Sequence, residues 1–304
     1  MTLPAVCLFA YRRPIHLSRS WQSLAENAEA TQTDLHVFLD GPKSSKDINK
    51  VLETRVEAKK IRGFKKIFFY EANSNLGLSQ SILNGIKKVS QQVSSWIVLE
   101  DDLVVGKHFL KFMHDALRCY EIDPAVASIH GYVYPTSDPL PETFFLRGAD
   151  CWGWGSWNRA WSHFEKDGGR LMQALLKSPL QELFTFRGSA SYLNMLAEQI
   201  EGKNDSWAIR WYASAFLAGM FTLYPGRSLV QNIGLDASGT HCARSSKYDT
   251  ELFQGRIDVN PQAVTESKAA REAFEHFFRG KKTSRPEQRF RQILFKIKEK
   301  LGLV

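Results

Sequence analysis

Apolar and polar positions in the first third of the chain follow two alternating patterns. Four short runs are almost wholly apolar, which is typical of strands that are buried in a sheet. Between them, apolar side chains recur every three or four residues, as they do along a helix with one buried face. Strands are predicted at Ala5 to Ala10, Leu35 to Leu39, Lys66 to Tyr70 and Ser95 to Leu99, and helices from Pro14, over Lys46 to Lys60 and from Leu78. This alternation predicts an α/β fold with a mainly parallel sheet flanked by helices.

The second half of the chain is less regular. Strands are predicted at Val126 to His130, Phe144 to Leu146, Phe221 to Tyr224 and Leu229 to Asn232, with helices over Ser189 to Ile200 and Trp207 to Gly219. A polar loop, Gly234 to Thr240, then leads to His241. This half shows no strict alternation of strands and helices.

Polar or glycine-containing segments follow each strand predicted in the first half. They are Tyr11-Arg12-Arg13, Asp40-Gly41, Asn73 to Gly77 and Glu100-Asp101-Asp102. In an open parallel sheet, ligands bind in the crevice beyond the carboxyl ends of the strands. We therefore expect these four segments to meet at one binding site.

The acidic triplet Glu100-Asp101-Asp102 directly follows an apolar strand. Neighbouring carboxylates repel one another, so their ionised forms require a nearby cation. Mg²⁺ usually binds one or two carboxylates together with substrate phosphates. We therefore predict that Asp102 holds Mn²⁺ or Mg²⁺, and strand alternation places Glu100 and Asp102 on one face and Asp101 on the other. A solvated turn, or Asp102 as the N-cap of a helix that begins near Lys107, explains the same residues.

The four strand-end segments, in this order, resemble the GT-A-fold glycosyltransferases. The resemblance lies in Tyr11-Arg12-Arg13-Pro14, the Asp40-Gly41 turn, Asn75-Leu76-Gly77-Leu78 before a helix, and Val98-Leu99-Glu100-Asp101-Asp102. The triplet is similar to the Glu-Asp-Asp form of the DXD signature in N-acetylglucosaminyltransferase I-like members, and the chain also looks like family 2 members of bacterial polysaccharide type. The matching order covers roughly residues 4 to 240.

This resemblance implies a Rossmann-like GT-A domain, with a mixed, mainly parallel central sheet flanked by helices, that binds a nucleotide-sugar donor. The residues that it implies for the nucleoside are Ala10, Tyr11, Arg12 and Asp40, although related bacterial sequences often carry Asn at the position of Arg12. The residues that it implies for the rest of the donor are Asn75 and Gly77 at the border of the nucleotide pocket, Glu100 beside the donor, Asp101 facing the ribose or sugar, and Asp102 holding Mn²⁺ or Mg²⁺ on the diphosphate.

A segment rich in Trp and Gly lies between Asp150 and Trp161. Trp157 and Trp161 are predicted to belong to a packed core, because they stand at helical spacing. Aromatic faces also stack on the C–H surfaces of sugars, and glycines let a loop approach a ligand closely. We expect Trp152, Gly153 and Trp154 to line the sugar pocket, which the resemblance also implies.

An inverting sugar transfer needs a carboxylate that accepts the proton of the acceptor hydroxyl. The resemblance places this base at Asp205, although Ser206 could occupy the same column. The local alternative is that Asp205 is the N-cap of the next helix, and Asp150 is the competing carboxylate. His241 matches the region that closes over the diphosphate in related transferases, but a single His is equally compatible with a structural role.

Composition is that of an ordinary globular chain, with 304 residues, 43% hydrophobic and 24% charged. No apolar run approaches the roughly 20 residues of a membrane-spanning helix, and the first residues lack the pattern of a secretory signal. The four cysteines show no zinc or redox spacing. We therefore expect a cytoplasmic protein with reduced thiols.

The net charge of +8 is concentrated near the C-terminus, where residues 268–304 contain 11 Lys and Arg against 4 Asp and Glu, a net +7. Because the body is nearly neutral, no nucleic-acid partner is expected. From Pro286 onward, one helical face carries Phe290, Ile293, Leu294, Ile297 and Leu301. A basic amphipathic helix over 286–304 can contact an anionic membrane, or it can dock on the body with its basic side in water.

These features predict a GT-A glycosyltransferase domain at 1–245, with 1–105 as the nucleotide-binding half and 106–245 as the acceptor-side half, followed by a C-terminal extension at 246–304. The resemblance favours an inverting transfer from a UDP-sugar to a glycan or lipid-linked glycan in surface polysaccharide synthesis, such as that of O-antigen. One alternative is a sugar-1-phosphate nucleotidyltransferase, which should carry a Gly-rich, basic loop after the first strand. The other is a non-catalytic glycan-binding protein that retains the fold.

Overall fold

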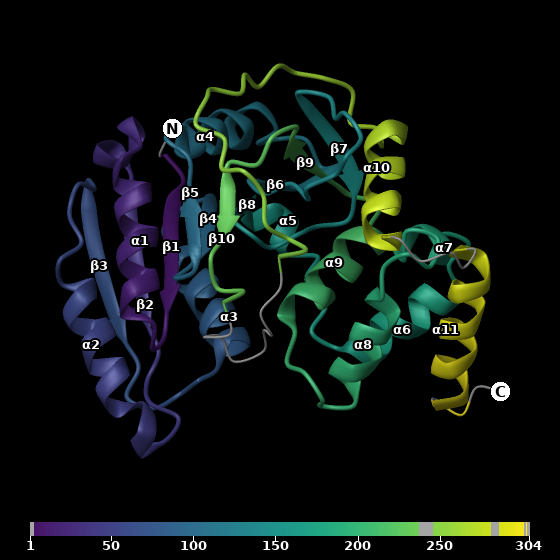
Figure 1. The fold of residues 1–304 in the computed structure, drawn as a ribbon, viewed down its shortest axis with the longest axis horizontal. Helices are drawn as coiled ribbons and strands as arrows, with labels where there is room; N and C mark the ends of the chain where they lie inside the picture. The colour runs from purple at the N-terminus through teal and green to yellow at the C-terminus, as the bar shows by residue number, and fades with distance from the viewer. Residues whose placement is uncertain (1–2, 237–245, 281–285, 301, 303–304) are drawn as a thin grey trace.

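The computed structural model describes residues 3–236, 246–280, 286–300 and 302. Its centre is an eight-stranded sheet with the strand order β3-β2-β1-β4-β8-β6-β9-β7 (Figure 1). The first four strands are all parallel, and they are β1 (Ala5–Ala10), β2 (Asp34–Leu39), β3 (Lys66–Glu71) and β4 (Ser95–Glu100). The four strands predicted in this half are therefore confirmed to within one residue at each end.

Helices connect these parallel strands, as the periodicity predicts. They are α1 (Pro14–Ala25), α2 (Ile48–Ala58) and α3 (Leu78–Val89), with short 3-10 turns at Ala28–Gln32 and Ser45–Asp47. Helix α1 buries Leu17, Trp21 and Leu24, which recur at helical spacing. Helix α3 approaches the sheet closely at Gly85, where a Cβ atom would lie 2.6 Å from the Phe9 ring.

The second half adds four strands to the sheet, two of which run antiparallel to the rest. These strands are β6 (Val126–His130), β7 (Thr143–Arg147), β8 (Trp154–Trp157) and β9 (Phe221–Pro225). Strand β8 runs antiparallel to both of its neighbours, β4 and β6, whereas β6 and β9 are parallel. A separate antiparallel pair is formed by β5 (Leu103–Val105) and β10 (Val230–Asn232). The sheet is thus mixed, with its parallel part in the first half.

Most helices of the second half gather beyond β7 and β9 (Figure 1). They are α6 (Gly168–Lys177), α7 (Gln181–Phe184), α8 (Tyr192–Ile200), α9 (Trp207–Leu217), α10 (Lys268–Arg279) and α11 (Pro286–Lys300), while α4 (Phe109–Cys119) and α5 (Asn158–Trp161) lie against the sheet. Among the described residues, no helix is long and apolar enough to cross a bilayer.

Strand β8 corrects one prediction. Trp154, expected to line a sugar pocket, is 0% exposed and packs against Trp96 and Trp207 at ring-centroid distances of 5.1 and 5.4 Å. The adjacent Gly155 is a packing requirement, because a Cβ there would lie 2.9 Å from the Met113 side chain. Gly in this segment therefore reflects close contact with α4 rather than a ligand loop. Trp157 and Trp161 do lie in the core region, but Trp157 ends β8 and only Trp161 is helical.

The C-terminal segment packs back on the body. Ile257 belongs to the core around the sheet, and Phe274 of α10 belongs to a second core built around α6, α8 and α9. In α11, Ile297 is 1% exposed and Leu294 packs on the second core, while Lys300 pairs with Glu201 of α8. The side chains of Phe290, Ile293 and Leu301 lie outside the described residues.

Candidate functional site

The carboxyl ends of β1 to β4 meet at one edge of the sheet, because these four strands are parallel. The main chain links them there. The Ala10 carbonyl accepts a hydrogen bond from the Asp40 amide at 3.0 Å, and the Tyr11 amide donates to Asp101 Oδ2 at 3.2 Å. The expected meeting of the segments after β1, β2 and β4 is therefore observed, and a fourth segment joins them through Asp40.

Asp40 organises the loop after β3. Its Oδ1 accepts hydrogen bonds from the amides of Gly41 and Leu76, both at 2.8 Å, and its Oδ2 accepts from Asn75 Nδ2 at 2.9 Å and the Gly77 amide at 3.0 Å. A carboxylate has about four such acceptor sites. Asp40 therefore holds Asn75 and Gly77 in place with its full hydrogen-bonding capacity.

A cavity of about 320 Å³ opens beside Asp40, between the ends of β2 and β3 and helix α3. The rings of Phe38 and Tyr70 stack at 4.7 Å between centroids on its wall, and Lys88 Nζ lies 4.9 Å from the Tyr70 centroid. The remaining lining residues are Leu39, Asp40, Glu71, Ala72, Leu76, Ser81 and Asn84. An aromatic wall with a few polar groups is a common form of small-molecule site.

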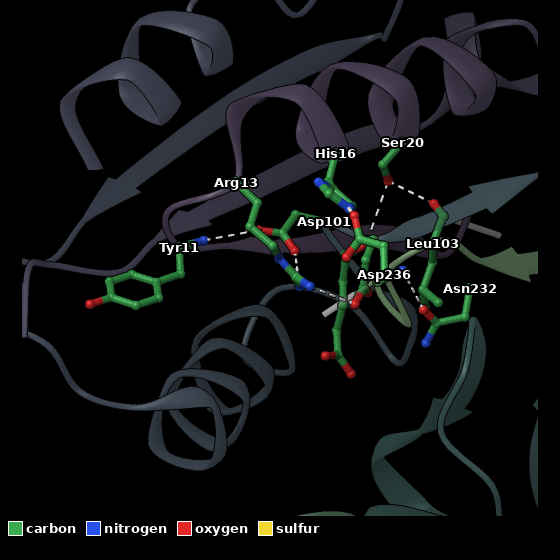
Figure 2. A network of polar contacts seen from close by, with 11 residues as sticks. Tyr11, Arg13, His16, Ser20, Asp101, Leu103, Asn232 and Asp236 are labelled. Carbon is green, nitrogen blue, oxygen red and sulfur yellow. Dashed lines mark hydrogen bonds and ion pairs between the residues drawn. The ribbon is translucent and has the colours of Figure 1, made fainter. Parts of the chain in front are cut away.

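Tyr11 and Arg12 form a second unit at this edge. Arg12 pairs with Asp47, and its guanidinium carbon lies 5.5 Å from the Tyr11 ring centroid. Tyr11 Oη accepts a hydrogen bond from the Lys43 amide at 3.1 Å. The Arg12 guanidinium lowers the pKa of the Asp47 carboxyl. Figure 2 shows the Tyr11 ring pointing away from Arg13 and Asp101.

Arg13 is the cation of the acidic triplet. It hydrogen-bonds to Asp101, and its Nη1 lies 2.9 Å from Asp102 Oδ2 (Figure 2). Arg13 is the N-cap residue of α1, and its position is fixed because Pro14 opens that helix. Both aspartates are almost inaccessible, at 2% and 9% exposure.

The ionisation of these groups follows from burial and from each other's charge. Burial raises the pKa of Glu100 to about 8 and that of Asp101 to about 6, with the neighbouring acids adding to the rise of Glu100. Burial alone would lower the pKa of Arg13, but the charges of Asp101 and Asp102 outweigh it and raise that pKa. The cluster is therefore a partly compensated group of buried charges.

The predicted alternation of the triplet is wrong, and the structure also rules out both local alternatives for Asp102. Strand β4 ends at Glu100, so alternation does not separate the aspartates, and Asp101 and Asp102 both face Arg13. Asp102 is neither in a solvated turn nor an N-cap, because it is buried and β5 intervenes before α4, whose N-cap residue is His108. The physical reason is that the chain turns at once to form β5.

The segment after β10 covers the triplet. The Ile233 amide donates to the Asp102 carbonyl at 2.8 Å, and Gly234 lies so close that a Cβ there would be 2.1 Å from Asp102 Oδ2. Asp236 pairs with His16 of α1 at 3.2 Å. The sequence places Arg13 at this edge but does not predict its pairing with the aspartates. It also gives no sign of the roles of His16 and Gly234, because these depend on contacts between distant segments. His241 lies outside the described residues.

A divalent ion at this edge would find few free protein ligands. Both Asp101 oxygens are engaged, by the Tyr11 amide and by Arg13, and Asp102 Oδ2 faces Arg13. The described part of the chain contains no cluster of three or more His, Cys, Asp or Glu side chains suited to a metal. Asp102 fits only as a single carboxylate ligand of an ion that phosphates and waters otherwise coordinate, which is a common Mg²⁺ arrangement.

The two candidate bases have different surroundings. Asp205 is 74% exposed, and its nearest charged partner is Arg210 at 3.6 Å. The N-cap of α9 is Ser206, whose Oγ accepts from the Ile209 amide at 3.2 Å, so Asp205 is not the cap. Arg210 also donates to Ser79 of α3 at 3.0 Å, which places Asp205 at the junction of the two halves.

Asp150 is partly buried and hydrogen-bonded. Its Oδ2 accepts from Tyr134 Oη at 2.8 Å, and its Oδ1 accepts from the Cys151 amide at 2.9 Å. Burial, and then the charges of Asp150 and Glu100, raise the pKa of the Cys151 thiol. The antiparallel pairing of Trp154 with Val98 places the residues just before β8 beside the end of β4. Trp152 is half-buried beside Asp150, and Gly153 is buried against Val230.

Comparisons with known proteins give no family. No family model and no curated protein matches the chain. Solved structures that resemble it include TarS of S. aureus, with 12% identity over 74% of this chain and 36% of TarS, at a TM-score of 0.39. They also include the galactosyltransferase LgtC in complex with donor and acceptor sugar analogs, with 12% identity over 72% of each chain, at a TM-score of 0.37. A UDP-glucose pyrophosphorylase complexed with UDP-glucose matches with 12% identity over 73% of this chain and 90% of that chain, at a TM-score of 0.35. The chain thus spans about a third of TarS, and at TM-scores below 0.5 these likenesses do not decide its activity.

Proposed function

We propose that this protein is a glycosyltransferase that moves a sugar from a nucleotide-diphosphate donor, with a UDP-sugar favoured, to a hydroxyl group of an acceptor. The observation that carries the proposal is the group of Arg13, Asp101 and Asp102 at the carboxyl edge of four parallel strands. This is the edge at which open α/β sheets bind nucleotides. An Arg that already faces anions there is suited to a diphosphate, because its guanidinium binds phosphate oxygens in a bidentate manner.

In this proposal, the cavity beside Asp40 binds the nucleoside. Its volume suits a small planar ring, and Phe38 and Tyr70 offer an aromatic wall for stacking. Asp40 and Asn75 would act mainly by holding the loop at its rim, since the Asp40 oxygens are already occupied. Tyr11 and Arg12 would approach the nucleoside from the β1 side, as the resemblance implies.

The resemblance also implies a divalent ion, Mn²⁺ or Mg²⁺, with Asp102 as its protein ligand. When bound, such an ion would neutralise the charge that develops on the departing diphosphate. Arg13 would supply positive charge at the same edge by donating to phosphate oxygens. Release of Asp102 from Arg13 would leave that carboxylate available.

Transfer with inversion needs a carboxylate to accept the proton of the acceptor hydroxyl. The resemblance favours Asp205, whereas the surroundings favour Asp150. Asp150 is held by two hydrogen bonds next to the triplet, and a held carboxylate is better oriented than an exposed one. We therefore give Asp150 the role of base and keep Asp205 as the competing candidate.

The acceptor is a glycan or lipid-linked glycan of surface polysaccharide or O-antigen type in this proposal. Contact with an anionic membrane would use the exposed basic side of α11, at Arg291 and Lys296, because Ile297 is buried against the body. Flotation with anionic liposomes tests this contact. A chain ending at Thr283 should be recovered with the liposomes less often than the full chain, and equal recovery would end the idea.

Two other functions make different demands. A nucleotidyltransferase should carry a Gly-rich loop after β1, whereas α1 begins three residues after Tyr11 with no glycine between. A glycan-binding protein that retains the fold would need no nucleotide. A hydrolysis screen with UDP-, GDP-, CMP- and dTDP-sugars tests the proposal. Release of the nucleotide from one donor class supports it, and release of pyrophosphate from a nucleoside triphosphate with a sugar phosphate would replace it with the first alternative.

A further inference from the structure

A carboxylate beside aromatic rings adjoins the acidic triplet. We call Asp150, Tyr134, Trp152 and Tyr248 the Asp150 cluster. All four side chains are partly exposed. Tyr134 Oη donates to Asp150 Oδ2 at 2.8 Å, and Tyr134 and Tyr248 lie 6.2 Å apart between ring centroids. Trp152 and Tyr248 lie 5.8 Å apart with their rings nearly perpendicular. The cluster therefore combines one negative charge with three aromatic rings at the surface.

Two buried residues hold the cluster from beneath. Tyr132 is fully buried, packs 4.8 Å from the Trp152 ring and donates through Oη to the Tyr248 carbonyl at 2.8 Å. His130 of β6 accepts a hydrogen bond at Nε2 from the Trp152 amide at 2.9 Å. The main chains that carry Trp152 and Tyr248 are thus both fixed by side chains of the core.

The state of His130 follows from this contact. Since Nε2 accepts a hydrogen bond, the ring is neutral and carries its proton on Nδ1. Burial lowers the His130 pKa, in agreement with a neutral ring. The contact that the neutral His130 ring makes at Nε2 positions the Trp152 main chain.

The chemistry of the cluster matches that of a sugar ring. A pyranose has an apolar C–H face that packs on an aromatic ring, and hydroxyl groups that donate to carboxylates. From the residues that the structure describes, each Asp150 oxygen accepts one hydrogen bond, although a carboxylate accepts about four in all. About two positions on Asp150 therefore remain for ligand hydroxyls. This differs from Asp40, whose oxygens are fully used by its own loop.

The Asp150 cluster lies close to the acidic triplet. Strand β8 pairs antiparallel with β4, with Trp154 opposite Val98, so the segment just before β8 lies beside the end of β4 at Glu100. A sugar hydroxyl at Asp150 would therefore face the triplet. We infer that the Asp150 cluster is the acceptor subsite and binds a neutral pyranose, with Trp152 or Tyr248 against its C–H face and Asp150 accepting from its hydroxyl. That the bound sugar is the acceptor of the transfer rests on the proposed function. That the cluster binds a sugar does not.

Saturation-transfer NMR on the full chain tests the inference. The probes are the methyl β-pyranosides of glucose, galactose and N-acetylglucosamine, each with and without UDP and Mg²⁺. At least one should receive saturation on its ring C–H protons. Asp150→Asn, which keeps the shape of the side chain, should weaken its binding about tenfold, because a hydrogen bond to a charged group contributes about that factor.

Further variants separate sugar binding from folding. Trp152→Phe keeps a ring and should weaken binding less than Trp152→Ala, and a thermal melt checks each variant. The matched controls, Asp258→Asn and Phe295→Ala, change an exposed carboxylate and an exposed ring elsewhere and should bind as the wild type does. No saturation of any glycoside in the wild type, or Asp150→Asn binding as tightly as the controls, would overturn the inference.

The same samples distinguish the two hypotheses. If UDP binds but no glycoside does, the acceptor subsite is wrong while the proposed function stands. If a glycoside binds through Asp150 and UDP does not bind, the sugar subsite stands and the protein is better described as glycan-binding. Binding of both, with Asp150→Asn affecting only the glycoside, supports both statements.

Discussion

Arg13 and Asp102 form an ion pair at the end of β4, with 2.9 Å between Nη1 and Oδ2, and the same guanidinium binds Asp101. These partners come from segments 88 and 89 positions apart in the chain. The compensating cation that three adjacent acids require is thus a side chain of the protein itself. A divalent ion remains a prediction, and it would act in addition to Arg13.

Removal of this cation should destabilise the protein. Arg13→Ala leaves two buried aspartates without their counter-charge, and breaking a buried ion pair from one side typically costs about 3 to 5 kcal/mol. We expect a loss of about 3 kcal/mol in the free energy of unfolding, measured by urea denaturation at pH 7. Arg256→Ala, which breaks an exposed pair with Asp258, should cost less than about 1 kcal/mol.

A second substitution checks the cause. Adding Asp101→Asn to Arg13→Ala removes one of the orphaned charges and should restore part of the lost stability. Equal stability of Arg13→Ala and the wild type would contradict the assignment of Arg13 as the cation of the triplet.

Asp40 should matter for the order of the loop that it holds. In Asp40→Asn, the new amide group faces the Gly77 amide and the Asn75 side chain, which are donors themselves. Unsatisfied buried donors cost about 1 to 3 kcal/mol, so we expect a loss of about 2 kcal/mol. Hydrogen exchange at the Leu76 and Gly77 amides should also accelerate.

The control for this experiment is Asp138→Asn, which changes a more exposed carboxylate that pairs with His276. If Asp40→Asn exchanges at Leu76 and Gly77 at the rate of this control, the loop does not depend on the Asp40 carboxylate.

The sequence predicts the parallel half of the fold well, because each of its strands is a self-contained apolar run. It fails at β8, whose four residues Trp154–Trp157 include Gly155. The reason for that glycine is the contact with Met113 of α4, which no local pattern contains. Helix α10 was overlooked, although Ala270, Ala273 and Phe274 stand at helical spacing.

Only part of the candidate site could be predicted from the sequence, for a similar reason. The strand-end rule brings Tyr11, Asp40 and the triplet to one edge, which is a property of topology. It says nothing of which groups already satisfy one another there. Only the packed structure shows that Arg13 pairs with two aspartates. It also shows that the hydrogen-bonding positions of Asp40 are occupied by donors of the neighbouring loops.

The two candidate bases can be separated by charge-neutral substitutions. On the first donor and acceptor pair that gives turnover, Asp150→Asn should lower kcat by about a hundredfold or more, which is the usual contribution of a general base. Asp205→Asn should lower it by no more than a few fold, since Asp205 is 74% exposed. UDP affinity should be unchanged in both. The reverse result would return the role of base to Asp205.

The contribution of His114 to stability should be lost in mild acid, in the opposite direction to the contributions of Glu100 and Asp101, whose raised pKa values favour the folded state there. Burial is the main cause that lowers the pKa of His114 to about 4 from 6.5, with Asp115 opposing and Lys111 and Arg118 adding to the effect. Between these values the unfolded chain binds the proton and the folded chain does not, so this contribution is lost as the pH falls from about 6.5 to about 4. The loss attributable to this group is at most about 3 kcal/mol.

Urea denaturation of His114→Asn across this range checks the assignment. Relative to the wild type, the variant should become more stable as the pH is lowered from 7 to 4.5, because it lacks the contribution that His114 loses. His163→Asn, an exposed control, should keep the wild-type slope. An unchanged slope in His114→Asn would show that other groups control acid sensitivity.

The central claim is that the edge with Arg13 and the acidic triplet binds a nucleoside diphosphate. Isothermal titration of the full chain with UDP, with and without MnCl₂, tests it most directly, with Asp102→Ala as the test variant and Asp258→Ala as its exposed control. We predict that UDP binds saturably to the wild type and to the control, and that Mn²⁺ strengthens this binding. Asp102→Ala should bind UDP about tenfold or more weakly. No UDP binding to the wild type, or equal binding to all three proteins, would contradict the claim.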